Sequence, residues 1–162
     1  MGYSSAFKLC TIDEQSAFNG CKLMSVVATV DDYLHEAGAL DKAMLPLGVC
    51  LAFCAHHRLL SQEFTRQRAE QLSAVRRQEG QVTTLFAAHG ATLYASDFTP
   101  QGLVFVRGYL PQLYADFAQT FEPACFEIDD DWSNYQQLAN VMIRHLLGQP
   151  RPAHTSRGVW ST

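Results

Sequence analysis

Cys50, Cys54 and His57 are the residues whose types and spacing most resemble a metal-binding set. Spacings of four and three residues place them on one face of a helix. Thiolate and imidazole groups are ligands that suit zinc or iron. Cysteine is also one of the most buried residue types, and a free thiol often packs as a small hydrophobe. We therefore predict core cysteines and neither a metal nor another cofactor, with metal binding as the alternative.

A second polar group consists of Asp31, Asp32, His35 and Glu36. Carboxylates one turn before a histidine can bind a metal or share a proton with the imidazole. Acids are also expected at a helix start, where the positive end of the helix dipole stabilises them. We expect the second explanation to hold, and we retain Asp31, Asp32 and Glu36 as a candidate surface for a protein partner.

The third group is the run Asp129, Asp130, Asp131 and Trp132. Residues 97–131 carry seven acidic side chains and only one basic side chain, so this part of the chain is strongly acidic. One acid of the run is explained as the cap of the helix that follows, and the other two exceed what capping needs. Acids beside an aromatic side chain suit a surface that binds a basic partner, with the tryptophan as anchor.

Arginines are concentrated at residues 66–77, but acids are interleaved with them, which is typical of a solvated helix face. The sequence contains no nucleophile elbow, no glycine-rich phosphate loop and no H-E-x-x-H motif. We therefore predict no catalytic residue and a protein that is not an enzyme.

The amino-acid composition limits which classes of protein this chain can belong to. The chain has 162 residues, is 48% hydrophobic and 17% charged, and carries a net charge of -4. It is long enough for one domain with a real core, and its charge argues against a nucleic-acid partner. The number of cysteines is odd and no secretory signal is visible, so we expect reduced thiols and a cytoplasmic location. No run is apolar enough for a membrane span.

These residues must be positioned by helices. The most apolar run, at about residues 45–58, predicts a buried central helix with Pro46 in its first turn. Gly48 is predicted to lie where another helix approaches closely, because glycine otherwise weakens a helix. Further helices are expected at residues 11–18, 62–78, 81–88, 99–121 and 133–148. Residues 22–36 favour a helix, although the valines before residue 31 leave a strand open.

The predicted fold class is therefore mostly α, with at most minor β structure. We expect a single compact helical domain at residues 1–148, followed by a flexible C-terminal tail at residues 149–162, which opens with two prolines.

Four segments resemble, in order, a family of small bacterial domains of unknown function. The first, Asp31-Asp32-x-x-His35, is similar to the family's D-D-x-x-W-H, and the second, Leu47–Phe53, is similar to H-I-G-M-F-L-A-W with Pro46 in place of the histidine. The third consists of Gly102-x-x-Phe105 with Tyr109 and Tyr114-x-Asp116-Phe117. The fourth, Asp131–Tyr135, is similar to D-S-W-x-N-Y. The resemblance covers about residues 31–138. Such domains look like the immunity proteins encoded beside bacterial toxins.

We therefore expect an immunity protein that neutralises a cognate toxin by blocking it, with acids matched to a basic cleft. One alternative is a metal-dependent enzyme that uses Asp31, Asp32 and His35, or else Cys50, Cys54 and His57. The other is a small regulatory adaptor.

Overall fold

A computed structural model describes residues 25–148, which form seven α-helices and one two-stranded antiparallel sheet. In chain order the elements are β1 (Val26–Thr29), α3 (Asp31–Ala37), α4 (Leu40–His56), α5 (Gln62–Gln67), α6 (Ala69–Arg76), α7 (Thr84–Ala88), β2 (Thr92–Tyr94), the 3-10 turn η1 (Ala95–Asp97), α8 (Pro100–Thr120), the 3-10 turn η2 (Cys125–Glu127) and α9 (Trp132–Leu146). The predicted mostly-α fold class is confirmed. The helix expected at residues 11–18 and the tail at residues 149–162 lie outside the described residues.

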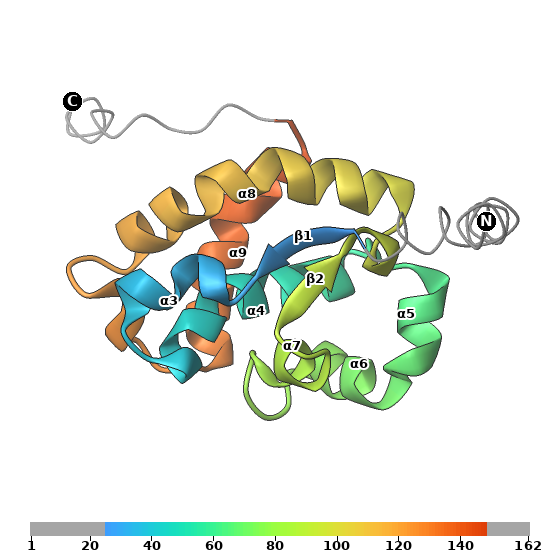
Figure 1. Cartoon of the computed structure of the whole chain (residues 1–162), viewed down its shortest axis with the longest axis horizontal. Coiled ribbons are helices and arrows are strands. Elements are labelled where there is room, and N and C mark those ends of the chain that lie inside the picture. The colour runs from blue at the N-terminus through green and yellow to red at the C-terminus, as the bar shows by residue number, and fades with distance from the viewer. Residues whose placement is uncertain (1–24, 149–162) are drawn as a thin grey trace, which may run out of the picture.

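Helix α4 forms the centre of the fold, with the β1–β2 ribbon in front of it and α8 above it in Figure 1. Every residue from Leu45 to Ala55 is buried, as the unbroken apolar run predicts. The expected position of Pro46 is wrong, because α4 begins six residues earlier, at Leu40. The preceding residues are mostly good helix formers, and the helix loses only the hydrogen bond that the missing N–H of Pro46 would donate.

The close approach predicted at Gly48 is confirmed, and the neighbour is Thr83 in the turn before α7 rather than the body of another helix. A Cβ atom at Gly48 would lie 2.7 Å from the Cγ2 atom of Thr83 and 3.1 Å from its Cα atom. Gly102, in the first turn of α8, is tighter still, since its Cβ would lie 2.1 Å from the carbonyl oxygen of Leu59. Both helices can reach their neighbours only where a side chain is missing.

Two expected helices differ from the structure. In place of the helix expected at residues 22–36, the described residues form strand β1 in the valine-rich part, and the helix begins only at Asp31. β1 pairs with β2, Thr29 opposite Thr92, and this partner far along the chain decides between strand and helix. The helix expected at residues 62–78 is divided into α5 and α6 at Arg68, whose φ of -114° departs from helical geometry.

Two other predicted helix starts are confirmed. The Thr99 hydroxyl accepts a hydrogen bond from the Gly102 N–H at 2.9 Å, and Pro100 occupies the first turn of α8. The Asp131 carboxylate accepts the Asn134 N–H at 2.8 Å and caps α9. Among the residues described, no helix combines the length and apolar character that crossing a bilayer requires.

Candidate functional site

A groove of about 530 Å³ lies between the start of α4, the segment that enters α7, and residues 126–130. Apolar side chains line part of it, namely Met44, Leu45, Phe126 and Ile128. Its charged lining consists of four carboxylates and one lysine, namely Asp41, Glu127, Asp129, Asp130 and Lys42. We call this the acidic groove. It contains two of the acids that the sequence selected, Asp129 and Asp130, and brings Asp41 beside them.

Asp130 fastens two walls of the acidic groove to each other. Its Oδ1 atom accepts hydrogen bonds from the backbone N–H groups of Val82 at 2.8 Å and Thr83 at 3.3 Å. Its Oδ2 atom accepts the Thr83 hydroxyl in a short hydrogen bond. These contacts tie the segment before α9 to the start of α7. Asp130 therefore shapes the groove, and its oxygens are already used within the fold.

Trp132 is also held by the fold. Its indole N–H donates to the carbonyl of Gly80 at 2.9 Å, and its ring lies edge-on to Tyr135 with a centroid separation of 5.1 Å. A second edge contact joins it to the imidazole of His56. The expected anchor residue is thus half-buried against α4 and α9, and it does not line the acidic groove.

Asp41 and Asp129 differ from these residues, because both are exposed and neither carboxylate has a hydrogen bond or ion pair within residues 25–148. Asp41 lies in the first turn of α4, where the helix dipole favours an acid. Glu127, by contrast, binds Lys42, with the lysine Nζ 2.7 and 2.8 Å from its two carboxylate oxygens. The acidic groove thus has two uncompensated charges on its rim.

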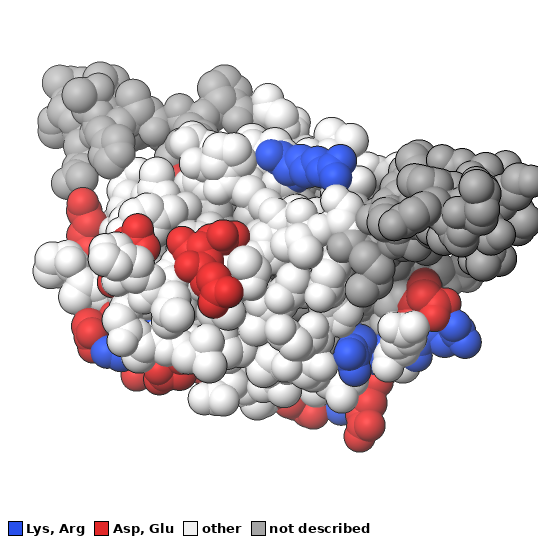
Figure 2. Space-filling view, viewed as in Figure 1, with Lys and Arg blue, Asp and Glu red and all other residues white. Residues whose placement is uncertain are grey.

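The acids of α3 form a second, separate surface. Figure 2 shows acidic side chains gathered over this part of the molecule. Asp31 and Asp32 lie in the first turn of α3, as expected of acids at a helix start, and Asp32 accepts the Thr29 N–H at 3.0 Å. Asp31, His35 and Glu36 are exposed, and none of them lines the acidic groove. The structure therefore leaves two candidate acidic surfaces where the sequence could not choose between them.

Cys50 and Cys54 are fully buried in α4, and His57 is exposed just beyond its end, with its ring tilted against that of Phe53 at a centroid distance of 4.2 Å. Burial, with a hydrogen bond to Cys50, raises the pKa of the Cys54 thiol. The two thiols act as core side chains, and His57 points into a different environment. Between residues 25 and 148 no three His, Cys, Asp or Glu side chains are grouped closely enough to hold a metal ion.

Sequence reasoning missed His56, which lies with His57, Tyr135 and Asn140 around a pocket of about 240 Å³ at the C-terminal end of α4. Its Nε2 atom is buried and has no hydrogen-bond partner in the part of the chain described. Burial, then His57 and then Arg76, lower the pKa of His56. Two adjacent histidines carry no spacing signal, so only the contact with α9 reveals this pocket.

It also missed a buried pair, in which the Nε2 atom of His89 lies 2.8 Å from the Oδ2 atom of Asp97. The same oxygen accepts the Tyr94 N–H at 2.8 Å, so the pair secures β2 to the end of α7. The His89 Nδ1 atom is buried and has no partner among the described residues. The two residues are eight positions apart and belong to no regular pattern, which is why the sequence does not predict their contact.

Of the comparisons with known proteins, the one with family models gives a match. No curated protein and no solved structure gives a significant match. The family model described as Domain of unknown function (DUF7832) matches residues 30–136, which include all residues of the acidic groove. The match covers more than half of the chain and nearly the same residues as the resemblance noted from the sequence motifs. The chain therefore belongs to this family of domains of unknown function.

Proposed function

We propose that this protein is an immunity protein that binds a cognate toxin in the cytoplasm and blocks it, with the acidic groove as the binding surface. The single observation that carries the proposal is the pair of uncompensated carboxylates, Asp41 and Asp129, on the rim of a partly apolar groove. A carboxylate that serves no contact within the described fold remains available to a partner. A basic side chain entering the groove would find both a counter-charge and apolar surface.

The two kinds of lining residue have different physical roles in this proposal. Exposed carboxylates attract a basic surface and speed the encounter, whereas buried apolar contact slows dissociation. Met44 and Ile128 supply partly buried apolar surface, and the buried Phe126 also lines the groove. The backbone around the groove is fastened by Asp130, so the rim charges are held in place before the partner arrives.

The proposal is tested with the genes that neighbour this one. Each neighbouring reading frame is expressed alone in a bacterial host, and any that stops growth is then expressed together with this protein. We expect one such product to be toxic, to co-purify with this protein, and to lose its toxicity in its presence. The Asp41→Asn/Asp129→Asn variant should protect less well at equal expression.

A matched variant, Asp31→Asn/Glu36→Gln, removes the same amount of charge from α3 and should protect as well as the wild type. The proposal is wrong if no neighbouring product is toxic. Full protection by the groove variant, with loss of protection in the α3 variant, would move the interface to α3. Binding of a non-toxic neighbour would favour the adaptor alternative.

A further inference from the structure

At the opposite end of α4 from the acidic groove lies a pocket of about 590 Å³. Its lining residues are Ala55, Arg58, Leu60, Gln62, Thr65 and Arg76, with no carboxylate among them. We infer that this arginine pocket binds a small molecule that carries a phosphate group, with Arg58 and Arg76 as the anion-binding residues. This site is distinct from the acidic groove and does not depend on the immunity proposal.

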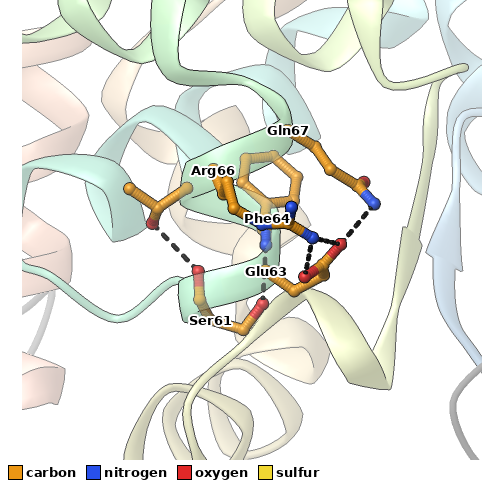
Figure 3. A network of polar contacts seen from close by, with 6 residues as sticks. Ser61, Glu63, Phe64, Arg66 and Gln67 are labelled. Carbon is orange, nitrogen blue, oxygen red and sulfur yellow. Dashed lines mark hydrogen bonds and ion pairs between the residues drawn. The ribbon is translucent and has the colours of Figure 1, made fainter.

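The two guanidinium groups are available, whereas Arg66 and Arg77 of the same region are occupied. Figure 3 shows Arg66 bound to Glu63, with its Nη2 atom 2.6 Å from each carboxylate oxygen. Arg77 binds Glu79 at 2.7 Å in the same way. Within residues 25–148, neither Arg58 nor Arg76 has an ion pair or hydrogen bond from its guanidinium group. The pocket therefore carries two positive charges that the described fold does not neutralise.

Arg58 is exposed just beyond the end of α4 and lines the pocket. It follows the end of α4 with φ of 57°, the left-handed conformation in which helices commonly end. The following N–H, of Leu59, donates to the Cys54 carbonyl at 2.9 Å and fixes this turn. Arg76 reaches the same pocket from the last turn of α6. One anion can therefore be contacted from two elements that are separately held.

The other lining residues indicate the rest of the ligand. The Thr65 hydroxyl already donates to the Ser61 carbonyl at 2.9 Å, so the Gln62 amide is the remaining uncharged donor. Ala55 and Leu60 give the pocket an apolar part. Its volume lies in the range typical of binding sites for organic ligands. The pocket is therefore larger than a bare phosphate ion needs. Planar guanidinium groups bind phosphate oxygens in bidentate fashion. The apolar part of the pocket and its volume favour a phosphomonoester over a free phosphate ion.

Binding is measured by NMR titration of the whole chain with phenyl phosphate, inorganic phosphate, benzoate and phenol. Phenyl phosphate should bind most tightly, because it alone joins a phosphate to an apolar group. His56 supplies a second readout, since Arg76 is one of the groups that lower its pKa. An anion that neutralises Arg76 should raise the pKa of His56.

Arg58→Gln and Arg76→Gln should each weaken phenyl phosphate binding by roughly tenfold, the order expected for one charge-assisted hydrogen bond. Arg76→Lys keeps the charge but not the bidentate geometry, and should fall between wild type and Arg76→Gln. Arg107→Gln removes an equally exposed charge from α8 and should change nothing. The inference is overturned if phenyl phosphate does not bind, if inorganic phosphate or phenol binds as tightly, or if Arg107→Gln has the same effect as Arg76→Gln.

Discussion

The two ends of α4 carry opposite charge, and each end opens onto a cavity. The N-terminal end, with Asp41, borders the acidic groove, and the C-terminal end, followed by Arg58, borders the arginine pocket. The helix dipole accounts for the signs, because it favours acids at the start of a helix and bases at its end. It does not account for the lack of partners: in the described fold, Glu127 is paired with Lys42 while Asp41 is not, and Arg66 is paired with Glu63 while Arg58 is not.

The comparison teaches which charges to examine in a protein of unknown function. A run of charged residues in the sequence contains side chains that make contacts within the fold and side chains that make none. Among Asp129, Asp130 and Asp131, the last caps a helix and the middle one fastens α7, so within residues 25–148 only the Asp129 carboxylate has no hydrogen bond or ion pair. The useful signal is thus the uncompensated charge beside a cavity, and only the folded structure separates it from its neighbours.

The largest effect on stability is expected at Asp130. Asp130→Ala should lower the free energy of unfolding by about 2–3 kcal/mol, because the N–H groups of Val82 and Thr83 lose an acceptor that carries charge. Asp129→Ala, its matched control, should change the free energy of unfolding by less than about 0.5 kcal/mol. Urea denaturation measures both. Equal destabilisation by the two variants would break the distinction between structural and free acids.

A smaller effect is expected for α4 itself, the element shared by both ends. Gly48→Ala should destabilise by about 1–2 kcal/mol, since the new methyl group meets Thr83, whose side chain can yield but whose backbone cannot. Gly108→Ala is the matched control, because its Cβ would find only an ordinary contact, 3.7 Å from the His145 Nε2 atom. That variant should be neutral or more stable by up to about 1 kcal/mol. Thermal unfolding of the two variants checks the prediction. A Gly48→Ala protein as stable as the wild type would show that α4 and Thr83 are not tightly packed at this point.

The smallest effect on stability concerns pH and the C-terminal end of α4. Burial lowers the pKa of His56 and of His57 below the ordinary 6.5. The unfolded chain therefore binds more protons as the pH falls below that value, and stability decreases until the folded-state pKa values are passed. His56→Gln/His57→Gln should lose less stability than wild type between about pH 7.5 and about pH 5. An identical pH dependence of the urea midpoint would contradict this; the difference is modest because solvent screens both groups.

The sequence predicted those features that depend on neighbours close along the chain. The burial of α4, the caps at Thr99 and Asp131, and the close contact at Gly48 all follow from local residue types. The sequence failed where distant segments meet. Strand β1 depends on β2, and the His89–Asp97 pair and the arginine pocket join residues with no regular spacing. The same limit applies to function, because the cavity that selects Asp41 and Asp129 is formed by three separate segments.

The most direct test of the central claim is the association rate of this protein with the toxic product of a neighbouring gene, at low and at high salt. Asp41→Asn/Asp129→Asn should lower the rate at low salt by about tenfold and flatten its salt dependence, since two steering charges are lost. The variant should remain folded, because neither carboxylate has a partner within residues 25–148. A folded variant whose rate and salt dependence equal those of the wild type would contradict the assignment of the acidic groove as the binding surface.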